Sequence, residues 1–203
     1  MDTPAKHTTA TGAGLSPGGL NVRLQPGRVP FDFTAVVERY ETPLLRYAGQ
    51  MLGPDREAAE EAVQETFLRL HRQVRDHGEA SVDNVASWLF RVAHNLSISV
   101  LRKRELGRKA QEQTAGRHTG EMPAVEPADA LDALVRKEMC RKALDELQAL
   151  PPEFRQVVLL KVIQGFSFRE IGEITGLSVS NVSYRLNRAL GEMARRLKAA
   201  GLV

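Results

Sequence analysis

Side chains that can donate hydrogen bonds gather on one face at the start of the segment 179–190. They are Ser180, Asn181, Ser183, Tyr184, Arg185 and Arg188. No acidic residue interrupts this face before Glu192. Donors of this kind pair with the acceptors on base edges in the major groove of DNA and with phosphate oxygens. The chemistry that this face predicts is recognition of duplex DNA.

Two helices joined by a tight turn are needed to position that face. Ser167 and Glu170 have the spacing of a capping box, which predicts that the first helix starts after Ser167. Gly176 permits the positive φ of a tight turn, and Ser178 can cap the second helix. The second helix has apolar residues at helical spacing: Val179, Val182, Leu186, Leu190, Met193 and Leu197. The pattern predicts a helix-turn-helix, and a polar helical hairpin that packs on another protein is the alternative.

The composition bounds the class of protein. Lys and Arg number 28 against 25 Asp and Glu in 203 residues. Because this excess is small, a basic surface that binds nucleic acid has to come from local clusters of Lys and Arg. Cys140 is the only cysteine, which excludes a disulfide framework and a multi-cysteine zinc site, and we interpret it as a small apolar core residue. Strand-like alternation is nearly absent, so the pattern predicts an all-α fold.

The N-terminal part begins with a segment, 1–30, whose composition predicts a disordered tail. An apolar helical stripe follows from Phe33 to Met51, and Pro43 inside it should bend or restart the helix. The sequence shows neither a membrane-spanning stretch nor a signal peptide, so we expect no membrane insertion and a cytoplasmic location.

A second helix is expected to begin at Asp55, with an apolar face turned inward and an acidic face outward. The outer face carries Glu57, Glu60, Glu61, Gln64 and Glu65. Glu57 in the first turn suits the helix dipole, but the later carboxylates lie beyond its reach. Two readings stay open, a solvated surface or a partner surface.

A third helix is expected to follow the polar loop 75–84. Its apolar face begins at Val85, and its outer face offers Arg91, His94 and Asn95. His94 has no second ligand at i+3 or i+4, so it does not indicate a metal site. The helix ends in a cluster of basic residues, Arg102, Lys103, Arg104, Arg108 and Lys109. Such a cluster favours a phosphate backbone, where each neutralised phosphate releases counterions.

The segment 107–130 is small, polar and broken by proline, which is typical of a flexible linker. A second helical module is expected over 131–200, with apolar positions that include Leu134, Met139, Leu144 and Leu147. The sequence therefore predicts two small helical domains, 31–106 and 131–200.

Two motifs in this order resemble one family. AEEAVQETFLRLHR (59–72), with WLFRVAHNLSISVLRKR (88–104), resembles region 2 of bacterial extracytoplasmic-function sigma factors, in the sigma-70 family. LPPEFRQVVLLKVIQGFSFREIGEITGLSVSNVSYRLNRAL (150–190) resembles their region 4. The resemblance implies an alternative sigma factor, a subunit of RNA polymerase that is not an enzyme and needs no metal or cofactor.

The resemblance also implies partners and site residues. Region 2 would dock on the β′ clamp helices of core RNA polymerase through Glu61, Gln64, Glu65, Phe67 and Leu68. The opened −10 element would contact Asn84, Arg91, Asn95, Arg102, Lys103 and Arg104. The −35 element would be read by the face that begins at Ser180. The polymerase β subunit and an anti-sigma factor are further expected partners.

The sequence departs from the family in places. Relatives commonly have a lysine at the position of Ser183 and an acidic residue at that of Ser99, and the loop before Trp88 is longer than in many members. These differences put the promoter preference outside what the resemblance implies. Three alternative readings stay open: an operator-binding helix-turn-helix regulator, an anti-sigma-like or purely protein-binding helical module, and a nucleic-acid enzyme. The sequence contains no P-loop, GxSxG or paired-histidine motif for the enzyme.

Overall fold

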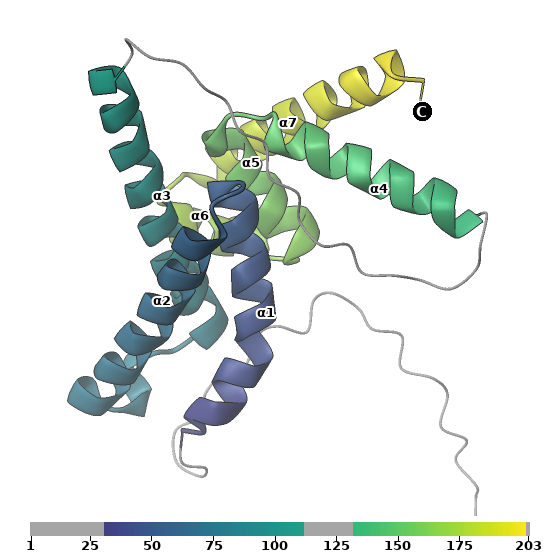
Figure 1. Ribbon diagram of the computed structural model, residues 1–203. Helices are drawn as coiled ribbons and strands as arrows, with labels where there is room; N and C mark the ends of the chain where they lie inside the picture. The colour runs from purple at the N-terminus through teal and green to yellow at the C-terminus, as the bar shows by residue number, and fades with distance from the viewer. Residues whose placement is uncertain (1–30, 112–131, 202–203) are drawn as a thin grey trace, which may run out of the picture.

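The computed structural model describes residues 31–111 and 132–201 (Figure 1). The predicted tail 1–30 and most of the predicted linker therefore lie outside the described residues. Over the described ranges the chain forms helices and no strand, which confirms the all-α prediction. The elements are α1 (Phe33–Leu52), α2 (Arg56–His77), the 3₁₀ turn η1 (Glu79–Ser81), α3 (Val85–Gln111), α4 (Asp132–Gln148), α5 (Pro152–Val158), the π-helical segment η2 (Leu159–Ile163), α6 (Phe168–Thr175) and α7 (Val179–Ala199).

The first module is a bundle of α1, α2 and α3. The side chain of Asp32 accepts a hydrogen bond from the backbone N–H of Ala35 and caps α1, and Asp55 caps α2 through Ala58 in the same way. Pro43 lies inside α1, which runs through it without restarting. Of the two effects predicted for Pro43, a bend or a restart, the continuous helix rules out the restart, because Tyr40 and Leu44 are both buried in the bundle and hold the helix on either side of the proline.

The second module contains the predicted helix-turn-helix. The hydroxyl of Ser167 accepts from the N–H of Glu170, and the Glu170 carboxylate accepts from the N–H of Ser167, so the capping box is confirmed. Gly176 ends α6 with φ of 74°, the left-handed conformation that a tight turn requires. Ser178 caps α7 by accepting from the N–H of Asn181. Local turn chemistry alone therefore fixes the start of the recognition helix.

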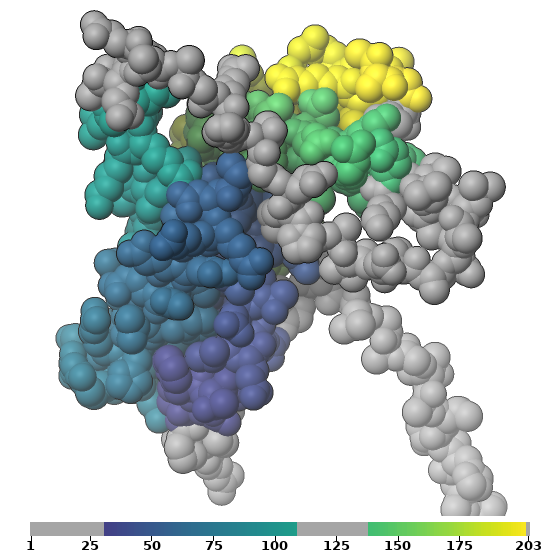
Figure 2. All heavy atoms as spheres, in the orientation of Figure 1, coloured from purple at the N-terminus to yellow at the C-terminus, as the bar shows by residue number. Residues whose placement is uncertain are grey.

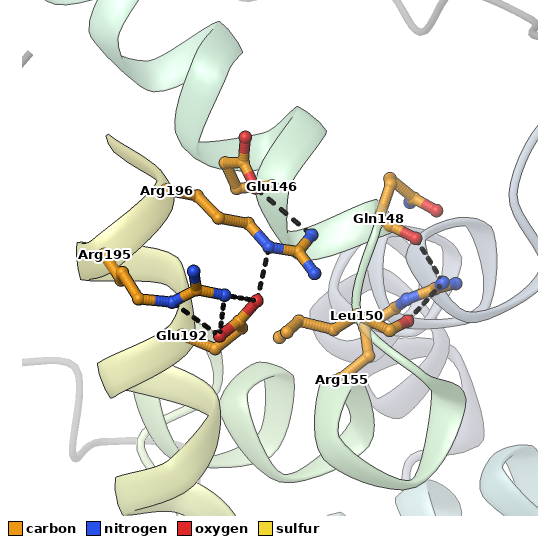
Figure 3. A network of polar contacts seen from close by, with 7 residues as sticks. All are labelled: Glu146, Gln148, Leu150, Arg155, Glu192, Arg195 and Arg196. Carbon is orange, nitrogen blue, oxygen red and sulfur yellow. Dashed lines mark hydrogen bonds and ion pairs between the residues drawn. The ribbon is translucent and has the colours of Figure 1, made fainter. Parts of the chain in front are cut away.

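An ion-pair network joins α4 to α7 (Figure 3). The Arg196 guanidinium lies 2.7 Å from Glu192, one turn earlier on α7, and 3.4 Å from Glu146 of α4. Leu147 of α4 is buried, but the N-terminal half of α4 extends away from the other helices (Figure 1). The C-terminal half of α4 is thus held by the module.

The two modules share one apolar core. Phe166, between η2 and α6, places its ring 5.0 Å from that of Phe90 in α3, centroid to centroid. Phe90 in turn lies 5.6 Å from the ring of Tyr47 in α1. In the space-filling view, the blue surface of the first module meets the green surface of the second where α1 ends (Figure 2). The bundle and the helix-turn-helix are therefore packed against each other.

Two expectations about single side chains were wrong. Cys140, expected in the core, is exposed on α4, and its neighbour Met139 is 42% exposed. Their exposure follows from the limited contact of α4 with the rest of the fold. His94, expected on the outer face of α3, is buried, because α3 packs against α1, α2 and α6 and has more than one covered side.

Candidate nucleic-acid interface

The predicted recognition face of α7 lies at the surface. Val182, Leu186 and Ala189 are buried and fix which side of α7 faces outward. The side chains of the predicted face are exposed at Ser180, Asn181, Tyr184 and Arg188 and half-buried at Ser183 and Arg185. Hydrogen-bond donors at the first turns of an exposed helix have the placement that major-groove reading requires.

The two arginines of this face are oriented by their neighbours. Arg188 donates to the Tyr184 hydroxyl at 2.7 Å, and its guanidinium carbon lies 5.7 Å from the centroid of the Phe154 ring. Nη1 of Arg185 lies 3.4 Å from the carbonyl oxygen of Glu153, at the start of α5. Phe154 thus helps to orient Arg188, a role for which no local pattern in the sequence gives a signal.

A second polar face follows α3. Arg91, Asn95, Ser99 and Arg102 succeed one another at intervals of three or four residues, so they share one side of the helix, and each is exposed. Lys103 is exposed beside them. Val85 and Leu89 are buried on the opposite side. The predicted contacts with single-stranded DNA therefore form an accessible strip, and no acidic residue lies between Arg91 and Lys103.

The remaining two residues predicted for this strip have structural partners. Arg104 donates to the carbonyl oxygen of Leu52 at 2.8 Å and pairs with Asp55, so it joins α3 to the turn between α1 and α2. The side-chain oxygen of Asn84 accepts from the N–H of Ser87 at 3.0 Å and caps α3. Both residues position the strip, and their contact with DNA stays a prediction.

His94 and Arg102 lie close enough to interact electrostatically. Burial, with the positive charge of Arg102 as a smaller contribution, lowers the pKa of His94 to about 4. The imidazole is therefore neutral at physiological pH. His94 contributes to the bundle under the strip and adds no charge to it.

The predicted polymerase-binding surface lies on α2. Glu61, Gln64 and Leu68 are exposed, and Leu68 is an apolar side chain at 51% exposure. Glu65 is half-buried and lies 2.8 Å from Arg69, whose hydrogen bond lowers the pKa of the Glu65 carboxyl. Phe67 is buried, so it supports this surface from beneath.

The described residues were also compared with the requirements of a metal site and of a membrane-spanning helix. Among residues 31–111 and 132–201, no group of three or more His, Cys, Asp or Glu is arranged to hold a metal ion. No helix within those ranges is long and apolar enough to cross a membrane.

The fold and the two exposed polar faces, on α3 and α7, define a two-module helical DNA-binding protein. Comparison with known families places it more narrowly. Residues 36–106 match the model of sigma-70 region 2, and residues 140–193 match that of sigma-70 region 4.

Individual relatives agree with these matches. The chain is 30% identical over 169 residues to the ECF RNA polymerase sigma factor SigW of Bacillus subtilis, which covers 82% of this chain and 89% of that protein. It is also 30% identical over 159 residues to EcfG of Rhodopseudomonas palustris, covering 78% and 82%. The chain belongs to the ECF sigma factors of the sigma-70 family, and it is an alternative sigma factor of transcription initiation.

Solved structures show the same fold. RpoE of Bartonella quintana, in complex with the anti-sigma factor NepR, superposes with a TM-score of 0.66 at 21% identity, over 82% of this chain and 97% of that one. CnrH, in complex with the cytosolic domain of CnrY, superposes with a TM-score of 0.57 at 24% identity, over 82% and 88%. Each superposition covers 82% of this chain, so it includes residues of both helical modules.

Proposed function

We propose that the two polar faces divide the promoter between them. The strip on α3 that begins at Arg91 holds the opened −10 element, and the face of α7 that begins at Ser180 reads the −35 element as duplex. The observation that carries the proposal is the pair of acid-free, exposed faces on two separate modules, which we delimit as 31–106 and 131–200. An electropositive strip tracks a single-stranded backbone, whereas a helix of the α7 kind fits the major groove.

The surface of α2 is assigned to core RNA polymerase. Glu61, Gln64 and Leu68 combine exposed polar groups with one exposed apolar side chain, which suits a docking surface on the β′ clamp helices. Glu65 lies at the edge of this docking surface, and Phe67 supports the surface from the core. The β subunit is a further expected contact of the second module.

An anti-sigma factor is also a proposed partner. Two similar solved structures are the sigma factor RpoE in complex with the anti-sigma factor NepR, and CnrH in complex with the cytosolic domain of CnrY. We extend this kind of partner to the present chain. We propose further that the chain acts in the cytoplasm, where it meets the polymerase, and that it carries no catalytic activity of its own.

Run-off transcription tests the proposed function. Core RNA polymerase is combined with a pool of upstream fragments from the genome of origin, with and without the protein. New transcripts that start at a fixed distance from a shared two-part motif are the expected result. Salt-sensitive binding to duplex fragments without any transcript would instead favour an operator-binding regulator.

A further inference from the structure

Arg188, on the recognition helix α7, is held by two aromatic side chains. Its Nη1 donates to the Tyr184 hydroxyl at 2.7 Å, and its guanidinium carbon lies 5.7 Å from the centroid of the Phe154 ring. A guanidinium within about 6 Å of a ring centroid is attracted by the π-electrons of the ring. Tyr184 lies one turn earlier on α7, whereas Phe154 lies on α5. Contacts from two elements therefore restrict an exposed arginine, whose side chain otherwise samples many rotamers.

The start of α5 gives Phe154 little freedom to move. Pro152 lies at the first position of the helix, where its fixed φ suits a helix start. The N–H of Phe154 donates to the carbonyl oxygen of Pro151 at 3.0 Å. One turn later Val157 is fully buried, and α5 packs directly along α7 (Figure 1). Phe154 is itself half-buried against the apolar core, so its ring is a fixed support for Arg188.

The hydrogen bond between Tyr184 and Arg188 determines which groups on DNA suit the pair. A tyrosine hydroxyl can accept a hydrogen bond and donate its own hydrogen at the same time. Arg188 has several N–H groups, and its contact with Tyr184 uses one of them. Both side chains are exposed on α7. The pair therefore presents mainly hydrogen-bond donors to a ligand, and it favours a ligand that carries acceptors.

Two groups of duplex DNA present acceptors close together. The major-groove edge of guanine carries O6 and N7, and the backbone carries the phosphate oxygens. Adenine and cytosine instead place an amino donor on that edge. A guanidinium can bind neighbouring acceptors with two N–H groups at once, provided that its plane is correctly oriented. The orientation of the arginine is therefore part of the recognition.

We propose that Tyr184 and Arg188 form one acceptor-binding site on α7, and that Phe154, outside the helix-turn-helix, is its positioning residue. The inference rests on the proposed reading of the −35 duplex by α7. Because Arg188 is held before DNA arrives, binding has less side-chain freedom to remove, which is the general advantage of preorganisation. Phe154 acts on the duplex only through Arg188.

Substitutions at Phe154 test this role in the full-length protein combined with core RNA polymerase. The probe is a duplex that the unchanged holoenzyme selects from a pool of random-sequence duplexes. Phe154→Leu keeps an apolar side chain but removes the ring, so affinity for this duplex should fall by about threefold. Phe154→Tyr keeps the ring and should restore the affinity. Thermal melts and affinity for core polymerase are measured on the same variants, and both should be nearly unchanged in Phe154→Tyr.

A double-mutant cycle separates positioning from a general effect on stability. Arg188→Ala should weaken duplex binding by about tenfold or more, and Phe154→Leu should cause no further loss when it is added to Arg188→Ala. Arg195→Ala is the matched background, because Arg195 is exposed on the same helix and pairs with Glu192. In that background Phe154→Leu should still cost about threefold. Equal losses in both backgrounds would overturn the positioning role, since a merely structural effect does not depend on Arg188.

Tyr184→Phe tests the other half of the site. The substitution removes the hydroxyl and keeps the ring, so duplex binding should fall by about threefold or more. The loss should be smaller when Arg188 is already alanine, because the two side chains act together. Fully additive losses would show that Tyr184 and Arg188 do not form one site.

Two further measurements identify the acceptor on DNA. If it is a guanine, replacing that base by 7-deazaguanine removes N7 and should remove most of the difference between the unchanged protein and Arg188→Ala. If it is a phosphate, the difference should be similar for all sequences, and Arg188→Ala should reduce the slope of log affinity against log salt by about one.

The same variants distinguish this inference from the function on which it rests. Normal affinity and a normal salt slope in Arg188→Ala would contradict the proposed reading of the −35 duplex by this face of α7, and the acceptor site with it. A loss in Arg188→Ala without any loss in Phe154→Leu would overturn only the positioning role of Phe154.

Discussion

The Tyr47 hydroxyl oxygen lies 2.9 Å from Nδ1 of His94, and both side chains are buried in the bundle. Burial raises the pKa of the Tyr47 hydroxyl and is the main cause of the lowered pKa of His94. Both groups are therefore neutral at physiological pH. The hydrogen bond joins α1 to α3 directly behind the strip that is proposed to hold the −10 element.

The burial of His94 in its neutral form predicts a pH-dependent stability. The pKa of His94 is about 4 in the folded protein, below the ordinary value of 6.5, so the unfolded chain takes up a proton more readily. The contribution of His94 is fully present above pH 6.5 and is lost as the pH falls toward 4. The free energy of unfolding should decrease by up to about 1.4 kcal/mol per pH unit in this window.

Denaturant unfolding between pH 7 and pH 4.5 measures this dependence. His94→Gln is the control, since it keeps a polar side chain but removes the titrating group. The slope of stability against pH should be smaller in His94→Gln than in the unchanged protein, and identical slopes would show that His94 does not contribute.

Turn chemistry made the helix-turn-helix predictable, whereas the burial of single side chains was less so. Ser167, Gly176 and Ser178 act on backbone groups within a few residues, so their effect can be read from sequence alone. The placement of His94 depends on which helices cover α3, and α6, one of these, lies some seventy residues further along the chain. Cys140 differs from the prediction in the opposite direction. It is a small apolar residue that is exposed, because few elements cover α4.

The exposed faces of the site were also predictable, because they follow from the period of α7 and α3. The roles of Asn84 and Arg104 were not, since the same residue types can bind DNA or cap a helix. Arg104 finds the carbonyl oxygen of Leu52, which lies 52 positions earlier in the chain. No local pattern indicates such a partner, and the same holds for the contact of the Phe166 ring with the Phe90 ring.

Arg102 and Arg104 should respond differently to substitution by alanine. Arg104→Ala removes the hydrogen bond to Leu52 and the ion pair with Asp55, so it should destabilise the fold by roughly 1–2 kcal/mol. Arg102→Ala should leave stability nearly unchanged and weaken binding to a single-stranded −10 oligonucleotide at low salt. Thermal melts and fluorescence anisotropy separate the two effects. An unchanged melt for Arg104→Ala would contradict its structural role.

Arg185 should determine use of the −35 element. If it contacts a base with both nitrogens, Arg185→Ala should cost about 1–3 kcal/mol of discrimination between the cognate duplex and a single-base variant. Affinity for core polymerase should be nearly unchanged, and a large loss of it would contradict the assignment. Arg195→Ala is the matched control, because Arg195 is exposed on the distal part of the same helix and pairs with Glu192.

Glu65→Lys should act on the polymerase and spare the promoter. The substitution places a third positive charge beside Arg69 and Arg72, both of which lie within 4 Å of the present carboxylate. Affinity for core polymerase should fall by about tenfold or more, since the groups on the polymerase that face the Glu65 carboxylate would now face a positive charge. Glu38→Lys, an exposed charge reversal on α1, is the control. Binding of the −35 duplex should be the same in both, and equal polymerase affinity would remove Glu65 from the docking surface.

Gly172 and Gly191 lie on the two helices of the helix-turn-helix, and alanine should have opposite effects at the two positions. A Cβ at Gly172 would lie 2.8 Å from the backbone carbonyl oxygen of Leu177, so the turn has to shift to admit it. Gly172→Ala should therefore destabilise the second module by roughly 1–3 kcal/mol, as overpacking does elsewhere. At Gly191 nothing lies within 4 Å of the added carbon. Gly191→Ala should gain about 0.5–1 kcal/mol from helix propensity. Chemical denaturation of both variants measures these changes in the free energy of unfolding. Higher stability of both variants would mean that the turn adjusts to the added carbon at little cost and that Gly172 does not set its geometry.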